Sequence, residues 1–270
     1  MIVNIVGGRG AMGRVHKPIF ESVGHEVIIS GRTSSPSLEE AAKQADLTIV
    51  SVPISATREI IERVAPHCNG IMDFTGLKEF PIQAMLKYSK PEMEVGGLHP
   101  LYGEVDSIEG RSIVYCPTER SEEKCRAVIR CLGLNGGEII TMEPEEHDRA
   151  MAVLQNARTC LLETYILLVN GLREQGLSLG RIYEISPKPT QILMDLAARQ
   201  ADTKNDQLYR EMREFNPHQE GIDSILFRCL ERIILGKEGD VSREIRAFFG
   251  GSLESAQERA KKLMENDRKR

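Results

Sequence analysis

The sequence predicts an α/β protein: a doubly wound sheet domain, mostly of parallel strands, followed by an all-α domain. Three observations support this. A glycine-rich turn follows a β-branched run at the start of the chain, and short apolar strands alternate with helices to about residue 142. Beyond Glu143 the apolar residues recur only at helical spacing. A length of 270 residues suits one large or two modest domains. We expect a dinucleotide-binding domain over residues 1–143 and a helical substrate and dimerisation domain over residues 144–270.

The first βαβ unit lies within the first 32 residues. A β-branched run over residues 1–6 leads into a G-x-G-x-x-G turn, and a second run over residues 26–30 follows the intervening helix. In such a motif the first glycine allows the tight turn, the second lets a pyrophosphate approach the backbone, and the third lets the helix pack closely. The helix N-terminus then faces the phosphates. The alternative is a glycine turn of purely structural use. The motif predicts a Rossmann-type domain whose cofactor contacts are Gly8, Arg9, Gly10, Ala11, Met12 and Gly13.

The residues after the second strand favour NADP over NAD. An NAD site usually places Asp or Glu here, where it accepts a hydrogen bond from the ribose 2′-OH. This chain has Gly31, Arg32 and Thr33 instead. A guanidinium pairs with a 2′-phosphate, and a hydroxyl donates to it. The alternative is an exposed arginine in a polar turn.

The remaining elements follow from the spacing of apolar residues and from the positions of turn and capping residues. The strand at residues 46–52 stops at Pro53. We expect the backbone of Ser51, Val52 and Pro53 to contact the cofactor. Further strands are expected at residues 70–73, 94–98, 112–116 and 138–141. Helices are expected at residues 11–23, after Ser37, and at 55–64, 80–88 and 121–132, then as one long helix over 147–172, and at 190–199, 207–215, 221–235, 241–248 and after Ser252.

Composition excludes several classes of function. The net charge is −5 and no basic tract suits nucleic acid. No apolar run approaches the ~20 residues of a membrane span. The chain enters a strand at once, so we expect no signal peptide. The six cysteines form no C-x-x-C pair, which favours free thiols in a reducing cytoplasm. The histidines lack the spacing of a ligand cluster, so we expect no metal.

In order and spacing, the chain resembles the prephenate dehydrogenases and their arogenate and cyclohexadienyl relatives. The most specific segment is Gly97-Leu-His-Pro-Leu-Tyr-Gly103. The other matching segments are residues 5–13, 50–54, Asp73 with Lys78, 146–148 with Met151 and Ala152, Ser186 with Pro187, and 207–209.

The resemblance implies an oxidative decarboxylation of prephenate to 4-hydroxyphenylpyruvate, a step of tyrosine biosynthesis. A hydride leaves C4 of the ring for the nicotinamide, a base takes the hydroxyl proton, and loss of carbon dioxide makes the ring aromatic. We predict His99 as that base, because it follows a strand at the ligand edge of the sheet and an imidazole titrates near working pH. The alternative is a structural histidine bonded to a loop carbonyl.

The substrate side of the site is matched less fully. We expect Lys78, Thr75, Gln155 and Arg158 to contact the dicarboxylate substrate. Family members often carry a serine where this chain has Gly76 and a second histidine at Thr159, and the guanidinium of Arg158 would replace a missing family arginine as a carboxylate ligand. For His147 and Asp148 we favour a structural role, in which Asp148 caps or complements the helix dipole and His147 packs at the domain junction. The alternative for both residues is contact with the substrate.

Two other functions stay open. The same chemistry could act on arogenate or an amino-deoxyprephenate analogue. From a different class, the chain could be a non-catalytic NADP-binding regulatory protein whose helical half binds a protein partner. By analogy of architecture we expect a homodimer formed through the helical domain.

Overall fold

The structure, a computed structural model, describes residues 1–201, 203–236 and 238–265. The chain forms two compact units: Met1–Ala152 with Leu208–Pro217, and Val153–Gln207 with His218–Arg270. The expected boundary between residues 143 and 144 remains a prediction, because compactness alone does not define an independently folding domain. Within the described ranges, no helix is long and apolar enough to span a bilayer.

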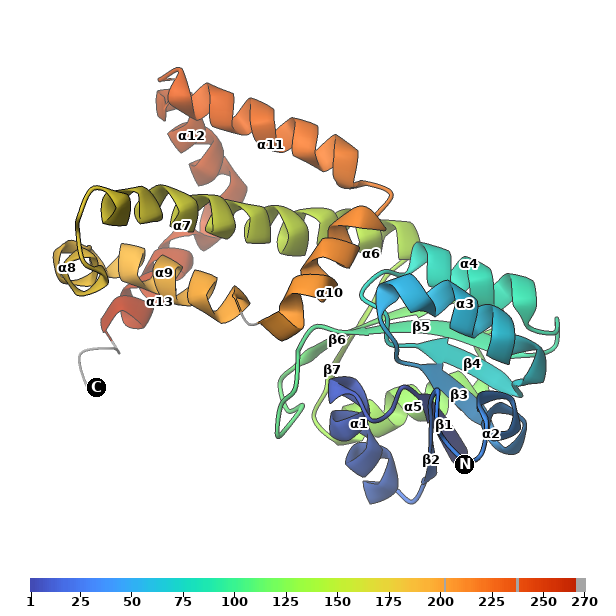
Figure 1. The fold of residues 1–270 in the computed structure, drawn as a ribbon. Coiled ribbons are helices and arrows are strands. Elements are labelled where there is room, and N and C mark those ends of the chain that lie inside the picture. The colour runs from blue at the N-terminus through green and yellow to red at the C-terminus, as the bar shows by residue number, and fades with distance from the viewer. Residues whose placement is uncertain (202, 237, 266–270) are drawn as a thin grey trace. The chain divides into compact units, whose positions relative to one another are not determined.

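A seven-stranded sheet forms the centre of the first unit (Figure 1), with the strand order β2-β1-β3-β4-β5-β6-β7. All neighbouring strands are parallel except β5 and β6, which pair antiparallel. The winding reverses at β1, which pairs with both β2 and β3, so the carboxyl ends of β1 and β3 border the crevice where such sheets bind ligands. The strands are β1 (Ile2–Val6), β2 (Glu26–Ser30), β3 (Leu47–Val50), β4 (Gly70–Asp73), β5 (Glu94–Pro100), β6 (Ser112–Pro117) and β7 (Glu138–Thr141).

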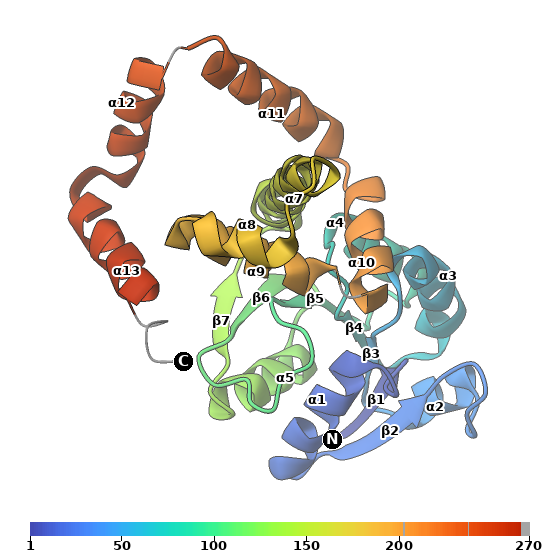
Figure 2. The same ribbon diagram turned by 60° about the vertical axis from the view of Figure 1, so that its left-hand side comes forward.

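Helices cover both faces of this sheet (Figure 2), as the doubly wound prediction required. Their bounds are α1 (Ala11–Ser22), α2 (Leu38–Gln44), α3 (Ile54–Val64), η1 (Ala65–His67), α4 (Glu79–Tyr88), α5 (Glu123–Leu134) and α6 (Pro144–Met151). Successive strand residues point to opposite faces. Val3 and Ile5 therefore pack in the core beneath α1 and α5, whereas Val6 and Val50 pack beneath α2, α3 and α4. Ser37 caps α2 in a capping box with Glu40, at the position expected from sequence.

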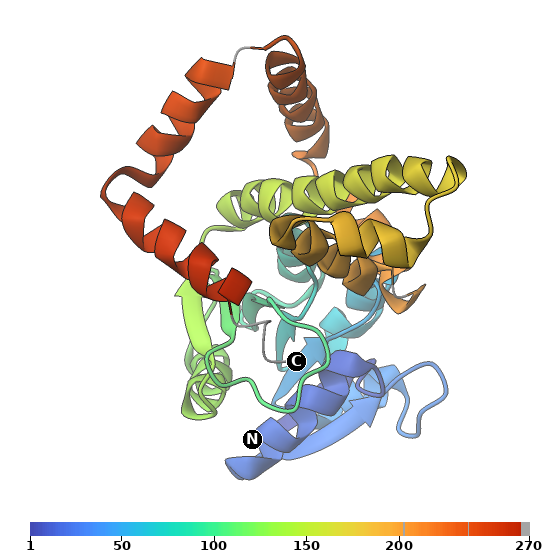
Figure 3. The same cartoon turned by 90° about the vertical axis from the view of Figure 1, so that its left-hand side faces the viewer.

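After α6, the regular structure of the described residues is all helical, as predicted (Figures 1 and 3). The helices are α7 (Arg158–Glu174), α8 (Leu179–Ile185), α9 (Lys188–Gln200), α10 (Thr203–Glu214), α11 (Gln219–Ile234), α12 (Glu238–Phe249), η3 (Gly250–Ser252) and α13 (Leu253–Glu265). Helix α7 packs against α9, and α12 contacts both α11 and α13. The sequence did not predict α8, whose seven residues are too few to show a period.

The expected long helix differs from the prediction in two respects. It begins at Pro144 rather than His147, since proline suits the first helical position. A π-helical segment, η2 (Ala152–Ala157), then separates α6 from α7. Such segments are frequent at functional sites.

One segment from late in the chain joins the first unit. Residues Leu208–Pro217, which include the second half of α10, cluster with the sheet domain. Within this segment Met212 packs in a small apolar core with Ile54, Leu77 and Met151. Sequence periodicity identified the helix but gave no signal for this placement.

Candidate functional site

The glycine turn lies at the carboxyl end of β1. Its left-handed residue is Gly7, with φ +78°, so the tight turn assigned to Gly8 belongs to Gly7 instead. A Cβ atom on Gly7 would lie 2.1 Å from the carbonyl oxygen of Ser51. The turn therefore touches the segment that follows β3, and the two predicted cofactor segments come together.

Close packing accounts for the other two glycines of the turn. A Cβ on Gly13 would lie 2.0 Å from the carbonyl oxygen of Gly8, and one on Gly8 would lie 2.4 Å from Cδ1 of Ile29. Helix α1 thus rests directly on the turn. Gly10 is its N-cap, makes no side-chain capping bond, and is followed by no acidic residue in the first turn. The first N–H groups of α1 therefore have no carboxylate of their own, and this cradle fits a phosphate group.

The turn after β2 holds the residues predicted to select the cofactor. The hydroxyl of Ser34 accepts from the N–H of Gly31 at 2.9 Å and donates to the carbonyl of Pro36 at 2.8 Å, which fixes the turn. Arg32 and Thr33 are exposed, and so is Arg9 in the glycine turn. In the described part of the chain, neither arginine side chain has a hydrogen-bond or ion-pair partner. These residues fit a 2′-phosphate.

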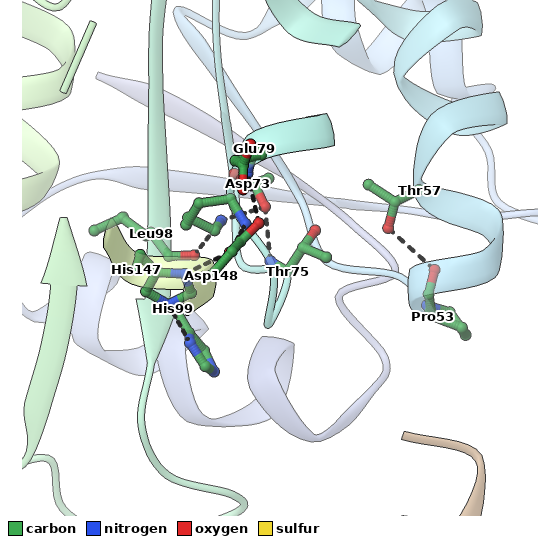
Figure 4. A network of polar contacts seen from close by, with 10 residues as sticks. Pro53, Thr57, Asp73, Thr75, Glu79, Leu98, His99, His147 and Asp148 are labelled. Carbon is green, nitrogen blue, oxygen red and sulfur yellow. Dashed lines mark hydrogen bonds and ion pairs between the residues drawn. The ribbon is translucent and has the colours of Figure 1, made fainter. Parts of the chain in front are cut away.

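The segment Ser51-Val52-Pro53 connects β3 to α3. The Ser51 N–H donates to the carbonyl of Val6 at 2.9 Å, which continues the pairing of β1 and β3 beyond their ends. The hydroxyl of Thr57 donates to the carbonyl of Pro53 at 3.1 Å (Figure 4). Since all three residues follow a strand at the crevice, their backbone lies where the sequence placed cofactor contacts.

His99 lies on β5 itself, one residue from its carboxyl end, rather than in the loop expected after the strand. Its Nδ1 lies 2.8 Å from Nε2 of His147, and Nδ1 of His147 lies 2.7 Å from Oδ1 of Asp148 (Figure 4). His147 and Asp148 are fully buried, and His99 is 7% exposed. The three side chains form a continuous polar chain that ends on a carboxylate.

Asp148 also caps a helix, though not its own. Its Oδ1 accepts from the backbone N–H of Lys78 at 2.7 Å, and its Oδ2 accepts from that of Glu79 at 2.9 Å (Figure 4). These N–H groups open α4, whose dipole favours a negative charge there. The expectation that Asp148 complements a helix dipole was right in kind, but the helix is α4 and not α6. His147 is fully buried, as the expected packing role requires, and its ring in addition bridges His99 and Asp148.

Burial sets the electrostatics of His99. Its pKa lies well below the ordinary value of a histidine, chiefly because burial disfavours the charged ring, with smaller lowering by the neighbouring His147 and Lys78. Burial therefore favours the neutral imidazole, in which one ring nitrogen carries a lone pair.

Lys78 and Asp73 form a second buried pair close to this chain. The ammonium group of Lys78 lies 2.5 Å from Oδ2 of Asp73 and donates to the carbonyl of Leu98 at 2.8 Å, and both charged side chains are 0% exposed. Burial raises the pKa of Asp73, while Lys78 and the N–H of Thr75 oppose that shift. The role of Lys78 as a substrate ligand remains a prediction, and these contacts favour a structural role.

Two buried oxygens beside this pair lack partners. Within the described residues, Oδ1 of Asp73 and the hydroxyl of Thr75 make no hydrogen bond, although Thr75 is only 4% exposed. Asp73 is the last residue of β4, the strand next to β5, and Thr75 lies just beyond it. A buried polar atom without a partner is costly, so a bound group that supplied one would be stabilised.

The loop that follows β5 contacts α1 through two pairs of side chains. Arg14 makes a bidentate pair with Glu104 at 2.7 and 2.8 Å. His16, at the buried side of α1, contacts the hydroxyl of Tyr102 through Nε2 at 3.0 Å and the carbonyl of Met12 through Nδ1 at 2.8 Å. The loop after the histidine strand and the helix after the glycine turn are thus tied by two side-chain contacts.

Gln155 and Arg158 belong to the second unit. Gln155 lies in η2 and is half-buried, and Arg158 opens α7 and is exposed, with its guanidinium 3.4 Å from the hydroxyl of Thr159. Their roles as substrate ligands remain predictions.

No metal centre is formed by the described side chains, since no group of three or more His, Cys, Asp or Glu residues is placed to hold an ion. The expectation that the protein needs no metal stays a prediction.

The fold defines a nucleotide-binding α/β protein with a buried histidine near the carboxyl end of β5. Residues 26–141 match the family model of the prephenate dehydrogenase nucleotide-binding domain. A protein of Methanocaldococcus jannaschii named "Probable arogenate/prephenate dehydrogenase" is 26% identical over 277 residues, covering 93% of this chain and 61% of its own length. The T-protein of Enterobacter agglomerans is 27% identical over 251 residues, covering 91% of this chain and 65% of its own.

The solved structures agree at the level of fold. Prephenate dehydrogenase from A. aeolicus, determined with hydroxyphenyl propionate and NAD+, superposes with a TM-score of 0.66 at 18% identity, covering 98% of each chain. Over residues 26–141 the chain is therefore similar to the prephenate dehydrogenase family. It spans less than two thirds of the length of the two curated relatives, 61% and 65%.

Proposed function

We propose that this protein is an oxidoreductase that catalyses the NADP-dependent oxidative decarboxylation of prephenate to 4-hydroxyphenylpyruvate. The observation that carries the proposal is the polar chain from His99 through His147 to Asp148 at the carboxyl edge of the sheet. The phosphate cradle of the glycine turn lies at the same edge, since β1, β3, β4 and β5 run parallel.

The polar chain defines which nitrogen of His99 acts as the base. A carboxylate only accepts hydrogen bonds, so Nδ1 of His147 carries a proton toward Asp148. In a neutral ring Nε2 of His147 is then an acceptor, and Nδ1 of His99 donates to it. This leaves Nε2 of His99 with a lone pair, as general-base catalysis requires. It takes the proton of the substrate's ring hydroxyl.

The cofactor would be held by this chain's own backbone and cations. The N–H groups at the start of α1 would face the pyrophosphate, the segment Ser51-Val52-Pro53 would contact the dinucleotide, and Arg32 with Thr33 would hold the 2′-phosphate. When bound, the nicotinamide supplies the hydride acceptor. Support for NADP is the absence of a carboxylate at the end of β2 together with the exposed Arg32.

We propose substrate contacts from the polar groups that could bond a dicarboxylate substrate. The buried hydroxyl of Thr75 has no partner among the described residues, so it is free to bond a substrate oxygen. Arg158 is exposed at the start of α7, and its guanidinium suits a carboxylate. Gln155 lies in η2, the segment just before α7. Lys78 is proposed to act indirectly, by fixing Asp73 and the end of β5.

Turnover is the direct test of the proposed function. We expect NADPH to form with prephenate and NADP faster than with prephenate and NAD, and faster than with arogenate and either cofactor. Faster turnover of arogenate would move the assignment to an arogenate dehydrogenase, a name that one relative carries beside prephenate dehydrogenase. Cofactor binding without any reduction would contradict the proposed activity.

Arg32→Ala tests the choice of cofactor. The variant should weaken NADP binding about tenfold or more, because it removes a charge-assisted hydrogen bond, and should leave NAD binding unchanged. Arg130→Ala on α5 removes an equal charge elsewhere on the first unit and serves as the control. Equal losses for NAD and NADP would show that Arg32 does not bind the phosphate.

We also propose that the protein works as a homodimer in the cytoplasm. Large apolar side chains lie exposed on α7 and α11, such as Leu167 at 73%, Phe227 at 74% and Ile234 at 81%. A second copy of the chain would cover them. The six cysteines are free thiols, four of them buried, which suits a reducing compartment. Sedimentation should give a dimer for the unmodified chain and a shift toward monomer for Phe227→Glu.

A further inference from the structure

The second half of α10 is anchored to the segment that precedes α3. The carboxylate of Glu211 accepts from the hydroxyl of Ser55 at 2.6 Å and from its backbone N–H at 3.2 Å, and Glu211 is only 6% exposed. Ser55 lies in the first turn of α3, two residues after Pro53. A buried carboxylate at a helix N-terminus is a stable attachment, because N–H donors and the helix dipole both favour the charge.

A second anchor joins the residues just after α10 to the polar chain of His99. The side-chain amide of Asn216 donates to the backbone carbonyl of Asp148 at 2.8 Å, and Asn216 is also buried. The segment Leu208–Pro217 is therefore fixed at two points, one next to the predicted cofactor segment and one on the residue that orients His147.

Between these anchors, Met212 lies beside the proposed base. A Cβ atom on Gly76 would lie 2.4 Å from the sulfur of Met212 and 3.6 Å from Nε2 of His99. The thioether thus occupies the space that a side chain at position 76 would fill, and Nε2 of His99 borders the same space. Met212 is only 2% exposed.

We propose that Met212 is a positioning residue whose thioether forms an apolar wall beside Nε2 of His99 and excludes water from it. The role of His99 as a base rests on the proposed function, but the wall is a property of the folded chain. An apolar neighbour leaves the lone pair of Nε2 without a competing hydrogen bond, so that a substrate hydroxyl is its first partner. Methionine suits this position because its flexible, polarizable side chain fills an irregular gap without a polar atom that competes strongly.

The charged and titratable groups around the ring stay in place when Met212 is changed. They are His147 on α6, with Asp148 behind it, and Lys78, with Asp73, before α4. A change in the protonation of His99 on truncation of Met212 therefore reports hydration rather than the loss of a charge.

The test is an NMR titration of the His99 side chain, which needs no turnover. In Met212→Ala, water enters beside Nε2 and stabilises the charged ring, so the pKa of His99 should rise by about one unit toward the ordinary value. Met212→Leu keeps an apolar wall of similar volume and should leave the titration within about 0.3 units of the unmodified protein. Leu208→Ala, a truncation of an exposed residue on the same helix, is the matched control.

Met212→Gln provides the same test if the alanine variant does not fold. It preserves the length of the side chain and places an amide oxygen beside the ring, so the pKa of His99 should again rise. An unchanged titration of His99 in either folded variant would overturn the proposal.

Kinetics separate this inference from the proposed function. If prephenate is the substrate, the acid limb of kcat/KM should move to higher pH in Met212→Ala, with kcat reduced about tenfold and the KM for the cofactor unchanged. If the unmodified protein turns over no prephenate, the proposed function fails, while the NMR titration still decides on the wall.

The geometry has a second, independent test. Gly76→Ala alone should lower kcat severalfold, because the new methyl group meets the sulfur of Met212. In the Met212→Ala background the methyl group has room, so the same substitution should cost less. Strictly additive losses in the double variant would overturn the contact between positions 76 and 212.

Discussion

Two histidines of the first unit are both buried, yet their surroundings differ. His16, on α1, is 0% exposed, and its pKa is lowered to about 4 by burial. Both of its ring nitrogens are engaged, and its ring lies 4.4 Å from that of Phe74 and 5.9 Å from that of Tyr102, centre to centre. His99, on β5, is held through Nδ1 by a chain that ends on a carboxylate, and within the described residues its Nε2 makes no hydrogen bond.

The comparison shows that burial and a lowered pKa do not by themselves identify a base. A base needs one nitrogen fixed by a partner that sets its tautomer and the other left open toward substrate. In His99, Nδ1 is held by the polar chain, and Nε2 has no hydrogen-bond partner among the described residues. His16 meets only the first, since the Met12 carbonyl fixes its tautomer but the Tyr102 hydroxyl occupies its other nitrogen, and we expect its effect to be on stability.

The largest effect is expected from His99→Asn. Loss of the general base should lower kcat about 10³-fold, while the affinity for the cofactor stays the same. Steady-state kinetics with prephenate and a binding titration with NADP measure the two quantities. Unchanged turnover would remove His99 from the mechanism and break the contrast with His16.

Asp148→Asn tests the far end of the polar chain. An amide offers one acceptor oxygen where the carboxylate serves three donors, so the His99 tautomer and the cap of α4 are both weakened. We expect kcat to fall at least about tenfold and the free energy of unfolding to fall by about 1 kcal/mol. Glu146→Gln, a charge loss at the exposed neighbouring position, should change neither quantity.

His16→Gln should act on stability and on its pH dependence. Because the folded pKa lies below that of the unfolded chain, the stability due to neutral His16 is complete above pH 6.5 and is lost as the pH falls toward 4. Denaturant unfolding at pH 7 should show a loss of about 1–3 kcal/mol in the variant. That difference should shrink at pH 5, with kcat at pH 7 within about twofold of the unmodified protein; a parallel offset at all pH values would contradict the shifted pKa.

Tyr102→Phe should give the smallest change. It keeps the ring beside His16 but removes the hydroxyl bonded to Nε2, which should cost about 1 kcal/mol of unfolding free energy and leave kcat unchanged. Tyr88→Phe, at a half-buried tyrosine on α4, is the control. A large loss of kcat would mean that the loop after β5 affects His99 more directly than its contacts indicate.

Most of the fold could be read from the sequence, because local signals and tertiary structure agree there. The bounds of β4 and β7 match the predicted ranges, and Ser37 caps α2 as its hydroxyl and the following acids suggested. The predictions failed where the deciding contact is distant. Nothing around Leu208–Pro217 indicates that this segment packs with the sheet, because Glu211 meets Ser55 across 156 positions of sequence.

The candidate site was predictable in its parts but not in its connections. The glycine turn, Ser51–Pro53 and His99 were each marked by a motif at the end of a strand. The bridge through His147 was missed, since its neighbour Asp148 offers a sufficient helix-dipole explanation in sequence. The burial of Lys78 was also missed, because only the folded chain places its ammonium on Asp73.

The reversal of direction between β5 and β6 has a mechanical consequence. A parallel β6 would carry the chain away to the opposite edge, whereas the antiparallel strand begins where β5 ends, so residues 101–111 stay beside the crevice. That short connection carries Tyr102 and Glu104, whose side chains bond to His16 and Arg14 of α1. The connection between β5 and β6 therefore joins the strand that carries His99 to helix α1. Lengthening this connection should loosen both the position of His99 and the start of α1 that faces the phosphates.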